Sequence, residues 1–226
     1  MMNVLFDLDG TLTDPREGIL ACFKYALQKL QVPAPIDREL ERFIGPPLWE
    51  SFSTLCGSNE KGVVEQAVAL YRERFAAKGM FENRIYPGIA DALARLQQAR
   101  AQLFVVTSKA RVFAEPIVEH FGLSRFFRSV HGSELDGSYA EKSELIARTL
   151  SSESLAADET VMVGDRAHDV IGAKANGVFS VGALWGFGSR EELTSAGADL
   201  LCESPKMIRD LIQVNPIRSR GVPSWK

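Results

Sequence analysis

The sequence has few cysteines, no excess of basic residues and no long apolar run. Its three cysteines, at positions 22, 56 and 202, are widely separated, so they indicate neither a disulfide framework nor a zinc site. A net charge of −3 gives no electrostatic footprint for nucleic acid. No apolar run is long enough to cross a bilayer, and acidic residues appear by position 7, too early for a signal peptide. We therefore expect a soluble cytoplasmic protein that binds neither nucleic acid nor membrane.

What the sequence does contain is a series of short apolar runs separated by helical patterns. The runs predict strands at residues 3–6, 102–106, 160–163, 178–181 and, more weakly, 199–202. The helical patterns predict helices at residues 90–99, 113–121, 143–150 and 169–176. Strands that alternate with helices in this way favour parallel βαβ units. We expect an α/β fold, a Rossmann-like doubly wound parallel sheet.

Residues 15–83 break this rhythm, because their apolar positions recur at helical spacing and no strand is evident. A proline stands at each joint, Pro15 at the entry and Pro87 beyond the exit, which suits a defined hinge. We predict a small all-helical cap domain over 15–83, inserted after the first strand of a core made of 1–14 and 84–214. Residues 215–226 show no periodicity and are expected to form a flexible tail.

Two aspartates end the first predicted strand. Strand alternation sends Asp7 and Asp9 to the same side, and Gly10 permits a sharp turn directly after them. Such a pair can supply a nucleophile and a proton carrier, or both carboxylates can bind a hard cation. The alternative is a local capping or turn role for one aspartate, with the other solvated.

The other predicted strands end in polar residues, and in an open α/β sheet these ends converge on one crevice. Thr107 and Ser108 follow the second strand, where a hydroxyl and backbone N–H groups suit an anionic oxygen or an ordinary helix cap. Asp165 and Asp169 follow the third strand and predict a cation site with Asp7, because clustered carboxylates repel one another. Oxygen ligands indicate Mg²⁺.

These motifs carry a family resemblance. The sequence DLDGT at 7–11, TS at 107–108, Lys142 and GDRAHD at 164–169 occur in the order found in the haloacid dehalogenase-like phosphatases. The helical insertion is similar to the small cap of that superfamily. The detail DGTLTDP, the longer GDRAHDVIGAKANG and the late run from Trp185 to Gly188 resemble the branch of phosphoglycolate phosphatases and 5′-nucleotidases.

The resemblance implies a role for each residue. Asp7 is the implied nucleophile, which forms an aspartyl-phosphate, and Asp9 is the implied acid and base. Asp7, Asp165 and the Asp9 carbonyl are the implied Mg²⁺ ligands, and Asp169 orients a metal-bound water or the lysine. Thr107, the Ser108 N–H and Lys142 are the implied phosphate contacts, and Lys142 also offsets charge. The implied enzyme is a Mg²⁺-dependent phosphatase of a small phosphate ester, phosphoglycolate or a nucleoside 5′-monophosphate, working as a monomer or a homodimer.

Substrate choice is expected to lie outside these motifs. The candidates are Arg16, Arg111, Gly45 and Pro46, the last two in a rigid turn of the insertion. Phe43, Trp49 and Phe52 offer stacking surfaces for a base, although aromatic residues near helix ends are commonly core. The arginines have the alternative of ordinary surface residues. His168 lies inside the last motif and receives no catalytic role.

Two other functions stay open. A sugar-phosphate mutase of the β-phosphoglucomutase type retains both Asp7 and Asp9 but returns the phosphoryl group to the sugar. A non-catalytic binding module would lack at least one core residue, and none is missing. A dehalogenase is disfavoured, because it needs neither Asp9 nor the metal cluster. A phosphonate hydrolase is disfavoured for want of an evident Schiff-base lysine in the insertion, where Lys61 and Lys78 are the candidates.

Overall fold

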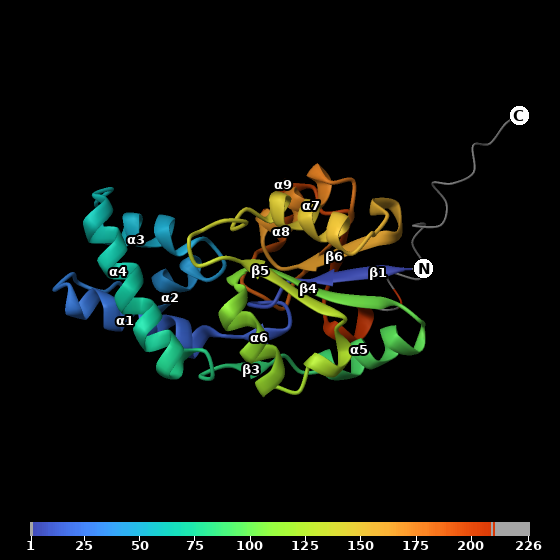
Figure 1. Ribbon diagram of the computed structural model, residues 1–226, viewed down its shortest axis with the longest axis horizontal. Coiled ribbons are helices and arrows are strands. Elements are labelled where there is room, and N and C mark those ends of the chain that lie inside the picture. The colour runs from blue at the N-terminus through green and yellow to red at the C-terminus, as the bar shows by residue number, and fades with distance from the viewer. Residues whose placement is uncertain (1, 209, 211–226) are drawn as a thin grey trace, which may run out of the picture. The chain divides into compact units, whose positions relative to one another are not determined.

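The chain folds into two compact units, each of which is seen in a computed structural model that describes residues 2–208 and 210 (Figure 1). The larger unit comprises the described residues up to Leu12 and those from Ile85 onward. The smaller unit is Thr13–Arg84. The tail predicted at 215–226 lies outside the described residues.

A six-stranded parallel sheet forms the centre of the larger unit. Its strands are β1 (Asn3–Phe6), β4 (Gln102–Ala110), β5 (Ser129–Ser133), β6 (Thr160–Gly164), β7 (Phe179–Ala183) and β8 (Leu200–Cys202). The strand order is β5-β4-β1-β6-β7-β8, and every neighbouring pair is parallel. β1 therefore lies inside the sheet between β4 and β6. The chain adds β4 and β5 on one side of β1, and β6, β7 and β8 on the other.

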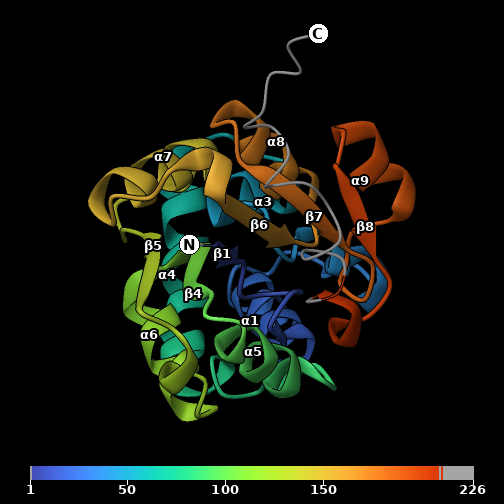
Figure 2. The same cartoon turned by 90° about the vertical axis from the view of Figure 1, so that its right-hand side faces the viewer.

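Helices cover both faces of this sheet (Figure 2). One face carries α5 (Ile89–Gln98) and α6 (Arg111–His120), and the other carries α7 (Lys142–Ser152) and α8 (Ala167–Ala175). The remaining helices of the unit are α9 (Arg190–Ala196) and the short η3 (Ser124–Phe126), η4 (Ala157–Glu159) and η5 (Pro205–Met207). The predicted doubly wound, Rossmann-like sheet is confirmed.

The apolar runs of the strands explain why the sheet is buried on both sides. Val4, Leu5 and Phe6 of β1 are each fully buried, as expected for a strand covered by helices on both faces. One core cluster joins the sheet to α7 and α8, and its members are Leu5, Phe104, Val106, Leu145, Ile146, Met162, Ala173 and Val178. Burial of these side chains fixes β1 and thereby the residues that follow it.

Besides the short helices η3, η4 and η5, which were not predicted, β5, β4 and α9 differ from the sequence prediction. β5 was not predicted, because Val130 is the one strongly apolar residue in a strand at the sheet edge. β4 continues to Ala110 instead of ending at residue 106, with an irregular register between Thr107 and Ala110. α9 was also missed; it begins where the Ser189 side chain accepts a hydrogen bond from the Glu192 N–H at 3.1 Å.

The smaller unit is helical. It contains α1 (Arg16–Lys29), α2 (Asp37–Leu40), η1 (Glu41–Phe43), α3 (Leu48–Cys56), α4 (Lys61–Arg74) and η2 (Phe75–Gly79). An aromatic cluster forms its core, in which the Phe23 ring lies 5.2 Å from Phe52 and 5.1 Å from Tyr71. Phe43 and Phe52 are thus core residues, whereas Trp49 is 42% exposed. At the joints, where no strand was predicted, β2 (Thr13–Asp14) pairs with β3 (Arg84–Ile85).

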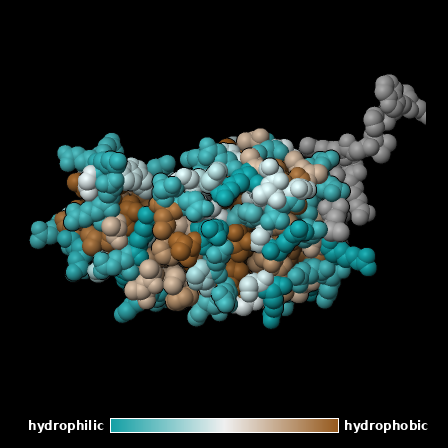
Figure 3. Space-filling model, in the orientation of Figure 1, coloured by the Kyte–Doolittle hydropathy of each residue, from teal (hydrophilic) through white to brown (hydrophobic). Residues whose placement is uncertain are grey.

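The surface shown in Figure 3 is largely hydrophilic, with apolar patches between the polar side chains. Among the described residues, the exposed large apolar ones are Ile36, Trp49, Phe81, Val112, Leu135, Tyr139, Ile171 and Met207. Exposed apolar side chains of this kind are common on folded proteins. Among the helices of the described residues, none has both the length and the apolar character needed to cross a membrane.

The cysteines give a direct test of the packing around β8. Cys202 is fully buried, and burial raises the pKa of its thiol to about 11. At pH 8 only roughly one such thiol in a thousand is ionised, and the thiolate is the reactive form. We expect iodoacetamide to label the half-buried Cys56 in the native protein and to label Cys202 only after unfolding in urea. Mass spectrometry of the labelled peptides measures this, and equal native labelling rates would contradict the packing.

Candidate active site

The carboxyl end of β1 carries the two aspartates that end the first strand. Asp7 follows the strand directly, and its N–H donates to the Val163 carbonyl oxygen at 3.0 Å, which ties it to β6. Asp7 is 3% exposed and Asp9 is 8% exposed. Gly10 turns the chain with a φ of +86°, and a Cβ there would lie 2.3 Å from Asp165 Oδ2. Both the turn and the close approach require glycine at this position.

Lys142, the first residue of α7, reaches this end of the sheet. It is 2% exposed, and its Nζ lies 2.9 Å from Asp7 Oδ1 and 2.8 Å from Asp169 Oδ1. The same ammonium donates to the Val106 carbonyl oxygen at 3.0 Å. Burial opposes its charge, but Asp169 and Asp7 outweigh burial and raise the pKa of Lys142. The residue is therefore a fixed positive charge between two carboxylates.

The carboxyl groups respond differently to burial. Burial raises the pKa of Asp165 well above its usual value, and the charges of Asp169 and Asp7 raise it further. Burial also raises the pKa of Asp7, against the opposing effect of Lys142. For Asp169 the Lys142 ammonium outweighs burial, so the pKa of Asp169 is lowered. One lysine thus does not compensate three neighbouring carboxylates.

Asp165 follows β6 and is held by two loops. Its Oδ1 accepts a hydrogen bond from Thr11 Oγ1 at 3.1 Å, and its Oδ2 accepts one from the Phe187 N–H at 2.8 Å. A Cβ at Gly186 would lie 2.3 Å from Asp165 Cβ, and one at Gly188 would lie 1.9 Å from the Asp165 carbonyl oxygen. The late glycine-rich motif therefore packs directly on Asp165.

Asp169 lies in the first turn of α8. Its Oδ2 accepts a hydrogen bond from the Arg166 N–H at 3.1 Å, which caps the helix, and its Oδ1 faces Lys142. Asp7, His168 and Asp169 each offer one ligand atom, and these atoms lie within 4.8 Å of one another. His168 thus lies in this cluster, although the sequence analysis assigned it no role.

Thr107 and Ser108 lie within β4 and not in a turn before a helix, which corrects the predicted strand end at residue 106. Thr107 is 2% exposed, and its Oγ1 accepts a hydrogen bond from the Lys109 N–H at 3.2 Å. Ser133 Oγ on β5 donates to the Ser108 carbonyl oxygen at 2.8 Å. The register between β4 and β5 is irregular between Thr107 and Ala110, so the segment stays in the strand but its side chains do not alternate regularly. The residue pattern does not reveal this irregularity.

Two further residues contact the site and were not predicted to do so. Lys109 Nζ lies 2.9 Å from Asp9 Oδ2, and both side chains are nearly buried. Trp185 Nε1 donates to the Thr11 carbonyl oxygen at 2.9 Å and so fixes the loop that follows the aspartates. The sequence placed Lys109 beside Thr107 and Ser108, and that adjacency is the one signal that pointed to it.

The predicted specificity residues are Arg16, Gly45, Pro46 and Arg111. Arg16 Nε lies 3.4 Å from Glu41 Oε1 within the helical unit. Gly45 adopts a φ of +104° in the turn before α3. Arg111 begins α6, and its Nη1 donates to Glu115 Oε1 at 3.1 Å. Both arginines are thus engaged in surface ion pairs, and a substrate role for these four residues stays a prediction.

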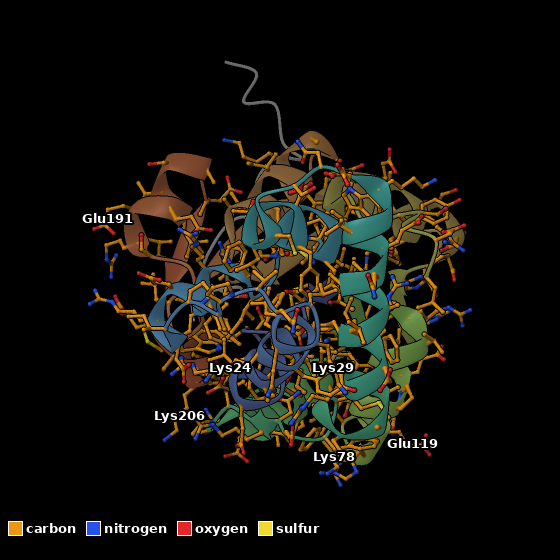
Figure 4. The ribbon with its side chains drawn as sticks, turned by 90° about the vertical axis from the view of Figure 1, so that its left-hand side faces the viewer. Lys24, Lys29, Lys78, Glu119, Glu191 and Lys206 are labelled. Carbon is orange, nitrogen blue, oxygen red and sulfur yellow. The ribbon has the colours of Figure 1, made fainter. Side chains whose placement is uncertain are left out.

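The lysines considered for a Schiff base are both exposed on the helical unit. Lys61 is 81% exposed at the start of α4, and Lys78 extends from η2 into solvent (Figure 4). An amine that forms a Schiff base is activated by desolvation or by a neighbouring cation. Neither lysine has desolvated surroundings within its unit, which agrees with the sequence argument against a phosphonate hydrolase.

The charges of the site fit a divalent cation. The buried carboxylates are those of Asp7, Asp9, Asp165 and Asp169, and the paired ammonium groups are those of Lys109 and Lys142. In their charged forms these groups carry a net charge of about −2, which a divalent cation offsets. Asp9 Oδ1 is buried and has no hydrogen-bond partner among the described residues. Carboxylate oxygens are the donors that Mg²⁺ prefers.

Gly164 tests how tightly Asp169 is placed. A Cβ at Gly164 would lie 2.3 Å from Asp169 Cγ, so Gly164→Ala forces the carboxylate or the strand to move. We expect the free energy of unfolding to fall by about 1–3 kcal/mol, measured by urea denaturation. The matched control is Gly62→Ala in α4, where a Cβ meets no atom within 4 Å. Equal stability of the two variants would show that the site tolerates this displacement.

The comparisons with known proteins agree with this geometry. The family model described as haloacid dehalogenase-like hydrolase matches residues 4–183. A protein of Pseudomonas aeruginosa named 5′-nucleotidase is 46% identical over 211 residues, which cover 93% of this chain and 95% of that protein. The tyrosine-protein kinase PtkA of Mycobacterium tuberculosis is 39% identical over 185 residues, which cover 82% of this chain and 62% of the kinase.

A comparison with solved structures also points to a phosphatase. The crystal structure of a predicted phosphatase from Clostridium acetobutylicum superimposes with a TM-score of 0.91 at 41% identity, and the match covers 95% of this chain and 99% of that one. The family model, the relative named 5′-nucleotidase and the fold agree with the resemblance that the four motifs carry, whereas the relative named a tyrosine-protein kinase was not predicted. The chain therefore belongs to the haloacid dehalogenase-like hydrolases and is a phosphatase of that family.

Proposed function

We propose that the protein hydrolyses phosphomonoesters of small metabolites, preferably nucleoside 5′-monophosphates, through a phosphoryl group carried by Asp7. The observation behind this proposal is the buried Asp7 carboxylate, held 2.9 Å from Lys142 at the end of an inner strand, with Asp9 two residues further on. The preference for nucleotides rests on the 46% identity with the Pseudomonas 5′-nucleotidase. Phosphoglycolate is the second substrate class.

In the first half of the proposed reaction, Asp7 attacks the phosphorus atom. Lys142 engages Oδ1 at 2.9 Å, so the attack is assigned to Oδ2. The bond from Oδ2 to phosphorus forms while the bond from phosphorus to the ester oxygen breaks. Asp9, which must first bind a proton on Oδ1, gives that proton to the leaving oxygen, and the alcohol is released. A covalent intermediate divides a difficult displacement into two easier steps.

In the second half, a water molecule attacks the phosphorus atom of the Asp7 phosphate. Asp9, now ionised, takes a proton from the water, and the bond from phosphorus to Asp7 breaks. The products are inorganic phosphate and the original Asp7 carboxylate, with Asp9 again protonated. The same residue therefore serves as acid in the first step and as base in the second.

The phosphoryl oxygens need positive groups around them, since phosphoryl transfer depends mainly on positioning and charge neutralisation. Thr107 and the Ser108 N–H are assigned to hold these oxygens, and Lys142 offsets their charge. Mg²⁺ is the proposed cofactor, held by Asp7, Asp165 and the Asp9 carbonyl, with Asp169 as a second-layer partner. When bound, such an ion neutralises charge on the phosphoryl oxygens. The ligand atoms of His168 and Asp169 near Asp7 make His168 an additional candidate.

Phosphate release from a substrate panel tests the proposal. The panel holds the nucleoside 5′-monophosphates, phosphoglycolate, hexose phosphates and phosphotyrosine, each assayed with Mg²⁺ and with EDTA. We expect the highest kcat/KM with a nucleoside 5′-monophosphate and at least a tenfold loss in EDTA, since the cation offsets charge in the reaction. A preference for phosphoglycolate would move the assignment to the second substrate class.

The panel also separates the alternatives. A hexose phosphate that is isomerised with little phosphate release, and only with a bisphosphate activator, would indicate the mutase. No release from any ester would favour the binding module. Activity that is equal with Mg²⁺ and with EDTA would remove the metal from the proposal.

The nucleophile has its own test. We expect Asp7→Asn to lower kcat by about a thousandfold or more, because an amide neither attacks phosphorus nor carries the phosphoryl group. The matched control is Asp158→Asn, a change of an exposed aspartate in η4, which is expected to leave kcat unchanged. Circular dichroism checks that each variant is folded. A folded Asp7→Asn enzyme with a near-normal rate would overturn the assignment.

A further inference from the structure

Lys109 makes a nearly buried ion pair with Asp9. Its Nζ lies 2.9 Å from Asp9 Oδ2, and the two side chains are 9% and 10% exposed. An ion pair in such surroundings is screened little by solvent and is sensitive to loss of either partner. Lys142 engages Asp7 and Asp169 instead. Each aspartate that follows β1 is therefore paired with its own lysine.

The fold brings Lys109 to this position through an irregular strand. The register between β4 and β5 shifts between Thr107 and Ala110, so Lys109 does not follow simple strand alternation. Its N–H donates to Thr107 Oγ1 at 3.2 Å, which holds the irregular segment from within. A Cβ at Gly132 of β5 would lie 2.6 Å from the Lys109 carbonyl oxygen. Gly132 therefore permits the close approach of the two strands at Lys109.

The pair leaves the two oxygens of Asp9 in different surroundings. Oδ2 faces the Lys109 ammonium, whereas Oδ1 is buried without a hydrogen-bond partner among the described residues. A buried carboxylate oxygen without a partner carries a free-energy cost that a substrate group or a bound ion removes. The side chain is therefore oriented, with one oxygen held and the other available.

We propose that Lys109 is a positioning residue, which holds Asp9 Oδ2 so that Oδ1 faces the oxygen whose proton it transfers. This inference rests on the proposed function, because it assigns the proton transfer to Asp9. Lys109 touches neither the phosphorus atom nor the leaving oxygen in this scheme. Its effect is on the geometry of Asp9, and hence on the step in which the leaving oxygen is protonated.

Leaving groups of different basicity isolate that step. The value of kcat/KM reports the reaction up to the release of the alcohol, so it excludes the later hydrolysis of the Asp7 phosphate. A phenyl phosphate with a strongly acidic phenol departs without a proton, whereas an alkyl phosphate needs one. General acid catalysis contributes about a hundredfold to ten-thousandfold to such a step. Loss of the Asp9 position thus acts selectively on poor leaving groups.

The experiment compares Lys109→Met, Lys109→Arg and wild type on a series of substituted phenyl phosphates and one alkyl phosphate. For Lys109→Met we expect kcat/KM to fall at least about tenfold with the alkyl phosphate and by less than about threefold with the most acidic phenol. Its plot of log kcat/KM against leaving-group pKa is therefore steeper. Lys109→Arg keeps the positive charge, so its slope is expected to stay close to that of the wild type. Lys61→Met, an exposed lysine of α4, is the control and is expected to match wild type.

Other outcomes overturn the proposal. An equal fall with every leaving group, with a raised KM, would assign Lys109 to phosphate binding. A wild-type slope in Lys109→Met would remove Lys109 from the reaction. If Lys109→Met does not fold, Lys109→Gln, which also removes the ammonium, is assayed in its place with the same expected result. A steeper slope in Lys109→Arg, despite its retained charge, would contradict positioning by the ion pair. A wild-type enzyme that releases no phosphate from any ester would overturn the proposed function itself, and so is distinct from these results.

Discussion

The repulsion among four buried carboxylates is the constraint on which this site depends. Asp7 and Asp9 follow β1, Asp165 follows the neighbouring strand β6, and Asp169 lies in the first turn of α8. Burial disfavours the charged forms of Asp7 and Asp165. Two ammonium groups, from Lys109 and Lys142, compensate part of this charge. The remaining negative charge is what a divalent cation would balance.

Close packing is the second requirement, and glycine meets it at several points of the same region. The missing side chains of Gly10, Gly186 and Gly188 make room for Asp165, and that of Gly164 makes room for Asp169. Backbone thus approaches Asp165 and Asp169 closely at these glycines. This arrangement limits the positions that each carboxylate can take, which is the preorganisation that phosphoryl transfer needs. The glycines of the motifs therefore leave the space that the aspartate side chains occupy.

The sequence predicted the parts of this molecule that depend on local pattern. The apolar runs around Leu5, Phe104 and Met162 indicated buried parallel strands, and the structure has strands there. β5 escaped prediction because an edge strand with one strongly apolar residue, Val130, lacks that pattern. Lys109 escaped because its direction is set by an irregular register against β5, a contact between segments far apart in the chain. The sequence motifs indicated which charged residues belong to the site. They did not indicate which carboxylate each lysine contacts, because that depends on the fold.

The two lysines differ in a way that suits different tasks. Lys142 is held by Asp7, Asp169 and the Val106 carbonyl, so its ammonium is fixed between two carboxylates and serves as a constant charge. Lys109 engages one oxygen of Asp9 from a strand segment that departs from regular pairing. In the proposed reaction the nucleophile Asp7 needs a constant environment, whereas the proton carrier Asp9 must gain and lose charge at one oxygen while the other stays fixed. Asp7 and Asp9 are only two residues apart, and a separate lysine for each allows the two carboxylates to have different surroundings. A single cation shared by both aspartates would not allow this.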